Sequence, residues 1–524
     1  MALTRRVFLT RLAATGGAAM AYDAMTGLGL LAAPAPSRFD LQGHGHGVRV
    51  VVLGAGLAGL VIAYELNKLG YVCTVLEGRG RPGGRAHTIR RGTTSEEEGS
   101  SQTCAFDEGL YYNPGAMRIP HHHQTTLGYC RELGVPVEAF INYCDSTYLV
   151  QTKSPRLAGE RLRYREARAD LDGYIAELLA KALSQEELDL PLTLNDRDNL
   201  IEYLRRSGAI TTDKSEYRGS TRRGYERPPG AGDDEGKRSN PLALSDLLGS
   251  RDGFYLQQDY DYQNSMLQVQ GGTDRLPQAF AARLKDKVVY HAKVTAIRQR
   301  EREVSVRYED RDGKIKTVDA DYCACTIPLL VLAAIDADFS GEFKAAIATA
   351  TYAPAGKIGL QFKRRFWEED DTIYGGHSST DQDIAQIVYP SHGFHARKGV
   401  LLGYYIMGQG GRPMGDKTPA ERLEAALEQG SRIHPQYREE FETAFSVAWH
   451  RVPWNLGSWA SFSGDARRDA YPLLLKPDGR VYLAGDHISN WSAWMQGALD
   501  SGRLVATQIH ARASQENPPR ETGA

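Results

Sequence analysis

The chain has no large excess of charge of either sign, few cysteines and no apolar run long enough to cross a membrane. Lysine and arginine total 63 against 65 for aspartate and glutamate, so no overall field would attract nucleic acid or an anionic membrane. The six cysteines form neither a CxxC pair nor a Cys/His zinc spacing, which favours buried thiols over a disulfide or zinc framework. With 41% hydrophobic and 24% charged residues, the composition is that of a folded globular protein. We therefore expect small-molecule partners, no nucleic acid and no membrane span.

The first 36 residues have the features of an export signal. Arg5 and Arg6 stand close to the start, ahead of a stretch rich in Ala and Gly. The pattern resembles a twin-arginine signal and predicts a periplasmic or secreted protein. Asp23 and several glycines make the stretch a poor membrane span, for which about 20 mostly apolar residues are needed.

Two internal stretches, 94–103 and 212–240, contain no Val, Ile, Leu, Phe or Met. Such segments cannot bury much apolar surface, so we expect both to be mobile polar loops. Apolar residues recur at helical spacing between 162 and 207, which predicts a helical insertion there.

Glycine is abundant, at 54 residues or about 10% of the chain against a usual ~7%. Residues 48–53 (VRVVVL) predict a buried strand that runs directly into Gly54-Ala55-Gly56-Leu57-Ala58-Gly59, and residues 60–69 predict a helix. In a GxGxxG turn the glycines allow a tight turn, close approach of a pyrophosphate and close packing of helix on strand. A second strand, 71–76, ends at Glu77, where a carboxylate can bind ribose hydroxyls. The order of these elements predicts a dinucleotide site.

The residues after Glu77 distinguish FAD from NAD. Three arginines and the glycine pair Gly83-Gly84 follow in Arg79-Gly80-Arg81-Pro82-Gly83-Gly84-Arg85, which predicts an additional phosphate-facing loop that a simple NAD site does not require. Here the sequence resembles the flavin amine oxidase family, in which an acid followed by RxGGR wraps the FAD diphosphate. The resemblance implies that FAD is the cofactor.

A second half of the cofactor site lies about 400 residues later. Residues 480–484 (RVYLA) predict a strand that ends at Gly485-Asp486, and a helix opens near Trp494. In the resembled family this segment binds the ribityl phosphate, and the helix points at the flavin ring. No cysteine follows Cys325, so we predict noncovalent FAD. The predicted cofactor-binding residues are Gly54, Gly56, Ala58, Gly59, Glu77, Gly78, Arg79, Gly84, Arg85, Gly115, Ala116, Met117, Arg118, Val294, Gly485, Asp486, Trp494, Met495 and Ala498.

Four residues are the predicted catalytic set. The segment Gly115-Ala116-Met117-Arg118 resembles the one beside the flavin in L-amino acid oxidases, whose arginine pairs with the substrate α-carboxylate. A guanidinium offers the planar fork that a carboxylate requires, whereas amine and polyamine oxidases have no need of it. The resemblance implies that Tyr389 donates a second hydrogen bond to that carboxylate and that Lys357 holds a water near the flavin.

Trp494 on the flavin-facing helix completes this set, and Trp454, Trp459 and Tyr389 could join it in an aromatic wall. Three consecutive histidines, 121–123, also invite a metal interpretation. Consecutive residues on a regular element cannot face one centre, and no acid is spaced to join them, so we predict no metal.

The sequence thus predicts an α/β fold with a GxGxxG (Rossmann-like) FAD-binding domain, a mixed-sheet α+β substrate-binding domain and a helical insertion. The expected FAD domain is discontinuous (46–116, 268–328 and 465–515), the substrate domain takes 117–160, 241–267 and 329–464, and the insertion with its loop takes 161–240.

The resemblance implies oxidative deamination of L-amino acids, bulky ones favoured, with molecular oxygen to a 2-oxo acid, ammonia and hydrogen peroxide. An L-amino acid monooxygenase, a monoamine or polyamine oxidase and a catalytically silent flavin-binding module remain alternatives. Homodimers are common in the family, but no sequence feature indicates one here.

Overall fold

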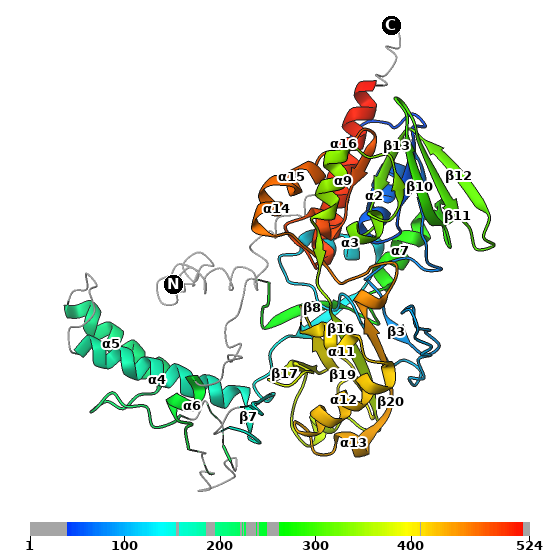
Figure 1. Cartoon of the computed structure of the whole chain (residues 1–524). Coiled ribbons are helices and arrows are strands. Elements are labelled where there is room, and N and C mark those ends of the chain that lie inside the picture. The colour runs from blue at the N-terminus through cyan, green and yellow to red at the C-terminus, as the bar shows by residue number, and fades with distance from the viewer. Residues whose placement is uncertain are drawn as a thin grey trace, which may run out of the picture.

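The computed structural model describes residues 39–153, 157–184, 194–220, 240–248, 261–408 and 410–516, together with residues 223, 225, 226 and 237. The predicted export signal therefore lies outside the described residues, as does about half of the predicted loop at 212–240. Figure 1 shows two bodies built around sheets, one above the other, with a helical arm to one side.

A five-stranded parallel sheet forms the core of the upper body, in the order β22-β13-β1-β2-β9. Alternate side chains of a strand face opposite sides, so Val50 and Val52 pack under helices while Val51 and Leu53 pack against a second sheet. The strands are β1 (Arg49–Leu53), β2 (Val72–Leu76), β9 (Val288–Val289), β13 (Tyr322–Cys325) and β22 (Val481–Leu483), and the covering helices are α2 (Leu57–Lys68), α3 (Gln124–Leu133), α7 (Arg275–Leu284) and α16 (Met495–Glu516).

The second sheet of the upper body has four strands in the order β12-β11-β10-β14. Four short helices lie beside it, and three of them contribute residues to the same hydrophobic core. These elements are β10 (Lys293–Gln299), β11 (Val304–Glu309), β12 (Ile315–Ala320), β14 (Asp336–Ala337), α8 (Leu329–Leu332), α9 (Gly341–Ala348), α14 (Gly464–Asp469) and α15 (Tyr471–Leu474).

The lower body contains a seven-stranded mixed sheet in the order β20-β16-β19-β18-β17-β6-β7. Every residue of β16 is buried, because this strand lies between β19 and β20 and is covered on both faces. The elements are β6 (Tyr148–Val150), β7 (Arg161–Arg163), β16 (Gly356–Phe362), β17 (His377–Thr380), β18 (Gln386–Val388), β19 (Gly399–Ile406), β20 (Phe441–Ala448), α10 (Phe366–Glu369), α11 (Gly411–Gly415), α12 (Pro419–Ser431) and α13 (Tyr437–Glu440).

Three two-stranded ladders join segments between the large sheets. They are β3 (Ile89–Arg90) with β4 (Tyr111–Tyr112), β5 (Val137–Ile141) with β8 (Ser265–Val269), and β15 (Thr351–Tyr352) with β21 (Ala460–Ser461).

The helical arm consists of α4 (Tyr164–Ser184) and α5 (Leu194–Gly208), where the sequence predicts a helical insertion, and of α6 (Leu244–Leu248), which falls in a segment predicted for the substrate domain. Ala176, Ala180 and Leu204 form a small core of their own between α4 and α5. In Figure 1 the pair extends away from both sheet bodies.

Two predicted domain boundaries need correction. Helix α3 falls in a segment predicted for the substrate domain, yet its Leu127 and Leu133 pack in the core under the five-stranded sheet. Likewise Leu329 of α8 and Phe343 of α9 pack against β1 and β13. In both cases the apolar face of the helix determines which domain it joins, and the position of the segment along the chain does not show this.

The polar loop at 94–103 is held by ion pairs, contrary to the expected mobility. Glu97 is 5% exposed and accepts hydrogen bonds from both terminal nitrogens of Arg422, at 2.9 and 2.8 Å. Glu96 pairs with Arg79 and Arg81. The prediction that this segment buries little apolar surface is correct. A buried charge paired with an arginine orders the segment instead.

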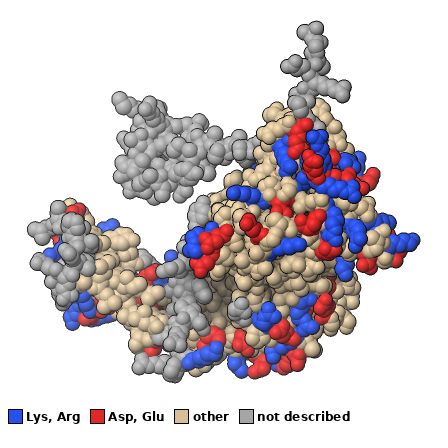
Figure 2. All heavy atoms as spheres, turned by 45° about the horizontal axis from the view of Figure 1, so that its top comes forward, with Lys and Arg blue, Asp and Glu red and all other residues tan. Residues whose placement is uncertain are grey.

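The cysteines are free thiols, five buried and Cys144 half-buried, as the sequence predicts. Among the described residues no helix is both long and apolar enough to span a bilayer. The face drawn in Figure 2 carries both signs of charge interspersed, in keeping with the balanced composition.

Candidate active site

The glycine turn after β1 forms the floor of a deep cavity. Gly54 adopts φ +99°, a conformation that L side chains rarely adopt, and a Cβ there would lie 2.6 Å from Thr326 Oγ1. A Cβ on Gly59 would lie 2.0 Å from the Gly54 carbonyl oxygen, so only glycine lets α2 pack this closely on the turn. A Cβ on Gly56 would meet nothing within 4 Å, because Gly56 borders the cavity.

The start of α2 faces this cavity without a capping side chain. Its N-cap is Gly56, and no acidic residue occupies the first turn. The free N–H groups and the positive end of the helix dipole therefore remain available to an anion such as a diphosphate.

Glu77 lies at the end of β2 with a fixed carboxylate. Oε2 accepts a hydrogen bond from the Ala55 N–H at 2.7 Å, and Oε1 accepts one from the Arg79 N–H at 2.9 Å. A carboxylate has about four acceptor positions, so two bonds leave capacity for a pair of ribose hydroxyls.

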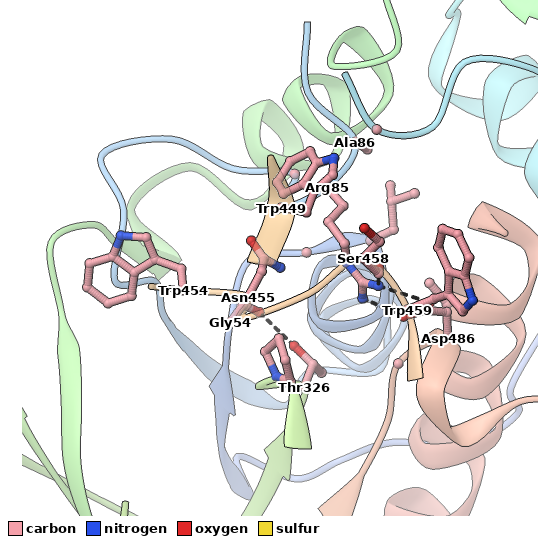
Figure 3. A pocket seen from close by; sticks show the side chains of 18 of the residues that line it. Gly54, Arg85, Ala86, Thr326, Trp449, Trp454, Asn455, Ser458, Trp459 and Asp486 are labelled. Atoms are coloured by element: carbon pink, nitrogen blue, oxygen red, sulfur yellow. Dashed lines mark hydrogen bonds and ion pairs between the residues drawn. The ribbon is translucent and has the colours of Figure 1, made fainter. Parts of the chain in front are cut away.

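The arginines of the RxGGR stretch are already engaged. Arg79 pairs with Glu96 at 2.8 Å and also contacts Asn455 Oδ1. Arg85 binds Asp486 Oδ2 at 3.1 Å and the Ser458 carbonyl, as the dashed lines in Figure 3 show. Burial raises the pKa of the Asp486 carboxyl, but Arg85 more than compensates and leaves it below its ordinary value.

One cavity of about 910 Å³ joins the two halves of the predicted cofactor site. It is bordered by Gly56 and Glu77 from the first half and by Gly485, Asp486 and Met495 from the second. The β22–α16 connection thus meets the β1–α2 connection across the carboxyl edge of the parallel sheet, where α/β proteins bind their ligands.

Arg118 lies in the wall at the other end of the cavity. Its Nη1 donates a hydrogen bond to Asn142 Oδ1 at 2.7 Å, and its Cζ lies 4.7 Å from the centre of the Tyr262 ring. No acidic side chain of the described residues pairs with it. A half-buried guanidinium without a carboxylate partner favours binding of an anionic ligand group.

Lys357 lies beside Arg118 and is 2% exposed. Its Nζ donates to the carbonyl oxygens of Gly115 at 2.7 Å and Asn113 at 3.3 Å. Burial and, after it, the nearby Arg118 charge hold the pKa of this amine well below its ordinary value. β16 is an interior strand, so Lys357 is not the solvated edge residue that lysine at a strand start usually is.

Most predicted site residues line this cavity. Besides Arg118 and Lys357, the lining includes Gly54, Gly56, Ala58, Glu77, Gly78, Arg79, Gly84, Arg85, Gly115, Ala116, Met117, Val294, Gly485, Asp486, Trp494, Met495 and Ala498. Gly59 does not line it and serves the packing of α2 instead.

Tyr389 is the clear correction. It is fully buried in the core of the lower body, where its hydroxyl contacts Ser378 Oγ at 2.7 Å and His434 Nε2 at 2.6 Å. It lines no part of the cavity, so it cannot donate to a substrate carboxylate there. Tyr405 of β19 does line the cavity, with its ring 4.4 Å from Lys357 Nζ.

The predicted aromatic wall is divided between the two ends. Trp454 packs on Gly78, where an added Cβ would lie 2.4 Å from the indole, and Trp459 lies near Asp486 in Figure 3. Only Trp494 lies near Arg118, through Tyr262, whose ring centre is 5.7 Å from the Trp494 ring. Trp454 and Trp459 therefore border the dinucleotide end.

Several lining residues had no sequence signal. Tyr262, Tyr405 and Met407 come from segments without a motif, and Asn142 supports Arg118 from outside the cavity. The periodicity of residues 399–406 predicts a strand that contains Tyr405. It does not predict that Tyr405 pairs with Lys357 of β16, because the register between the two strands is not encoded locally.

The histidine run also needs correction. His122 and His123 lie in a turn before α3 rather than on a regular element, and Asp261 joins them from a distant segment. Both premises for excluding a metal were therefore wrong.

The residues fit FAD. A carboxylate at the end of β2, an uncapped helix start, an open glycine and a second Gly-Asp segment follow one another along a single cavity that is large enough for an extended ligand.

Comparison with known proteins agrees with this geometry. The model of the flavin-containing amine oxidoreductase family matches residues 57–510. The flavin-dependent L-tryptophan oxidase RebO of Lentzea aerocolonigenes is 30% identical over 481 residues, which cover 88% of this chain and 98% of RebO. The L-amino-acid oxidase of Echis ocellatus is 28% identical and covers 88% of each chain.

Among solved structures, putrescine oxidase bound to putrescine superposes with a TM-score of 0.61 at 19% identity, covering 89% of this chain and 99% of that one. At that identity the likeness shows the fold alone. The family match spans most of the chain: this protein belongs to the flavin-containing amine oxidoreductases, with FAD as its cofactor.

Proposed function

We propose that this flavin-containing amine oxidoreductase is an L-amino-acid oxidase that forms a 2-oxo acid, ammonia and hydrogen peroxide. The observation that carries the proposal is Arg118, a cavity-wall guanidinium with no acidic partner among the described residues. An amine substrate offers that group nothing, whereas an α-carboxylate satisfies it. The names of the two relatives support the same substrate class.

In this proposal Arg118 and Tyr405 hold the α-carboxylate. Asn142 fixes one nitrogen of the guanidinium at 2.7 Å, which leaves the rest of the fork for the substrate. Burial raises the pKa of the Tyr405 hydroxyl and outweighs the Arg118 charge, which lowers it, so the hydroxyl keeps its proton and can donate a hydrogen bond. These two contacts orient the Cα–H bond for transfer.

Lys357 accepts the proton that the substrate ammonium must lose. Burial lowers the pKa of its amine well below the ordinary value, and its N–H groups donate to two carbonyls. In the neutral form its lone pair at Nζ would be available to the ammonium directly or through a water. Bound FAD would supply the acceptor for the hydride that leaves the Cα–H bond, and molecular oxygen would take up the two electrons as hydrogen peroxide.

Tyr262 and Trp494 favour large apolar or aromatic substrate side chains. Their rings lie 5.7 Å apart beside Arg118 and present an aromatic surface to whatever the guanidinium holds.

An anaerobic screen of flavin bleaching tests the proposal. L-Phenylalanine should reduce the flavin, whereas D-phenylalanine and phenethylamine should not. Reduction by phenethylamine as fast as by the amino acid would instead indicate an amine oxidase. Mass spectrometry of the aerobic product separates the remaining rival, because a monooxygenase yields the amide one carbon shorter in place of the 2-oxo acid.

We further propose that residues 1–36 direct twin-arginine export, since Arg5 and Arg6 precede an Ala- and Gly-rich stretch. Replacing both arginines by lysine should retain the protein in the cytoplasm. Unchanged export would refute this assignment.

A further inference from the structure

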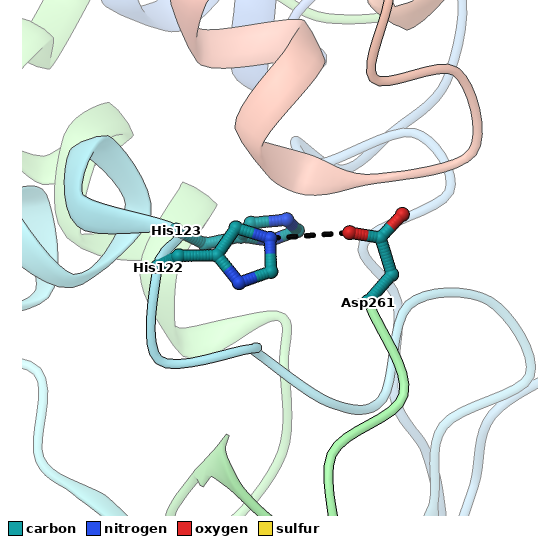
Figure 4. Close-up of side chains that lie close together, drawn as sticks. All are labelled: His122, His123 and Asp261. Carbon is teal, nitrogen blue, oxygen red and sulfur yellow. Dashed lines mark hydrogen bonds and ion pairs between the residues drawn. The ribbon is translucent and has the colours of Figure 1, made fainter. Parts of the chain in front are cut away.

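Two imidazoles and a carboxylate meet beside the Arg118 end of the cavity. One potential ligand atom each from His122, His123 and Asp261 lies within 4.8 Å of the others. Figure 4 shows both rings turned toward the Asp261 carboxylate. His122 Nε2 and Asp261 Oδ1 are 3.1 Å apart.

The local backbone makes this meeting feasible for neighbouring residues. His123 is the N-cap of α3 with φ −75° and ψ 63°, outside helix and strand geometry. The two rings consequently stand nearly perpendicular, with centroids 4.6 Å apart, rather than on opposite faces of a strand.

His123 contributes the most informative atom. The residue is 1% exposed, and among the described residues its Nε2 has no hydrogen-bond partner. Its ring packs against Trp494 at 5.0 Å and Trp491 at 5.4 Å. A buried polar atom without a partner costs about 1–3 kcal/mol, which a ligand in the structure would remove.

His122 is held from its other side. Gln263 bonds its Nδ1 at 3.0 Å, which keeps Nε2 facing Asp261. If the Gln263 amide turns by 180°, its oxygen accepts a hydrogen bond from Nδ1–H of His122. The same contact therefore suits the tautomer in which Nδ1 carries the proton and Nε2 binds a metal.

We propose that His122, His123 and Asp261 form a binding site for a divalent transition metal of the zinc class. Two imidazole nitrogens and one carboxylate oxygen suit Zn²⁺ and disfavour Mg²⁺ and Ca²⁺, which prefer oxygen alone. Tetrahedral ligands at about 2.1 Å from zinc are about 3.4 Å apart. Side-chain rotations that move each ligand atom by about 1 Å would therefore complete the site. The fourth position remains open to water.

Such a metal would tie two parts of the cavity wall together. Asp261 directly precedes Tyr262, whose ring lies 4.7 Å from the Arg118 guanidinium, and His123 packs on Trp494. The metal would thus fix the Tyr262 segment on the turn before α3. The proposal does not depend on the substrate assigned above.

Calorimetric titration of ZnCl₂ into tag-free, EDTA-treated holoenzyme tests the site, with elemental analysis after desalting for stoichiometry. We expect one zinc per chain and no binding of MgCl₂. Asp261→Asn and His123→Gln should weaken zinc binding by at least about 10-fold. His121→Gln is the matched control, because His121 is exposed, adjacent in sequence and outside the cluster.

Thermal unfolding provides a readout independent of activity. Zinc should raise the midpoint of the wild type and of His121→Gln, and not that of Asp261→Asn. Asp261 keeps 27% of its side chain exposed, so its replacement should not impair folding. Absence of stoichiometric zinc, or equal affinity in Asp261→Asn and the wild type, would overturn the proposal.

Discussion

The dinucleotide end of the cavity takes Gly54, Gly56, Glu77 and Arg85 from one stretch of about thirty residues, joined by the C-terminal Gly485-Asp486 segment, whereas the Arg118 end combines Arg118, Tyr262, Lys357, Tyr405 and Trp494 from five separate stretches. At the first end the backbone provides much of the binding surface, through glycines and a helix start. At the second end side chains provide it. Substitutions at the two ends should therefore fail in different ways, one by losing flavin and the other by losing chemistry with flavin retained.

The largest effect is expected from Arg118→Ala. Without the guanidinium a substrate carboxylate in the cavity is unpaired, so kcat/KM for L-amino acids should fall by the equivalent of roughly 2–5 kcal/mol. Steady-state peroxide production measures this, and flavin absorbance per chain should not change. Arg118→Lys retains charge but not the fork and should recover only part of the loss. Loss of flavin from either variant would contradict the division between the two ends.

Lys357→Met should lower kcat by about 100-fold or more, as removal of a proton acceptor does. The wild-type amine has a lowered pKa, so kcat should fall as pH decreases through that lowered pKa and Nζ gains a proton. Arg118 and the Tyr405 ring are the charged and titratable groups facing it. Stopped-flow measurement of the flavin reduction rate across pH checks this, because the fall in rate at low pH should be absent in Lys357→Met. If that fall persists in the variant, another group accepts the proton.

At the dinucleotide end, Glu77→Gln should weaken FAD binding by about 1.5–3 kcal/mol, the range for a hydrogen bond to a charged group. The amide nitrogen would face a backbone N–H that now donates to a carboxylate oxygen. Flavin retained after gel filtration measures the loss. Excess FAD should restore kcat/KM, and failure to do so would mean that Glu77 affects chemistry as well as cofactor binding.

The smallest effect is expected from Tyr389→Phe, which should cost about 1–2 kcal/mol of unfolding free energy, because His434 Nε2 loses the tyrosine hydroxyl and Ser378 Oγ keeps only its bond from the Tyr148 N–H. Denaturant unfolding measures it. The kcat/KM value should be unchanged, because Tyr389 lies outside the cavity. Tyr405→Phe is the matched control: it should lower kcat/KM with little change in stability. Reversed results would restore the original assignment of Tyr389.

The same contrast explains how much could be predicted. β1, β2 and the glycine turn lie where periodicity and GxGxxG placed them, since strand, turn and helix are neighbours in the chain and their geometry is local. Tyr389 was misplaced because the side that a tyrosine faces just after a strand depends on what packs there, and here its hydroxyl contacts His434, which lies 45 residues away. The ion pair of Glu97 was missed for a related reason, because Arg422 lies 325 residues from it. Arg79 and Arg81, which pair with Glu96, lie within 17 residues of it.

The sequence by itself determined the cofactor class and the parallel sheet that carries it, because a phosphate-binding turn depends on backbone freedom encoded by a few adjacent glycines. It also determined that Arg118 and Lys357 were the groups to examine. Tertiary structure alone decided that Tyr405, and not Tyr389, accompanies them, that Trp454 and Trp459 border the dinucleotide end, and that Asp261 approaches His122 and His123. Those contacts depend on the register of β16 against β19 and on loops that cross between sheets, and long-range register leaves no mark in any short segment of the chain.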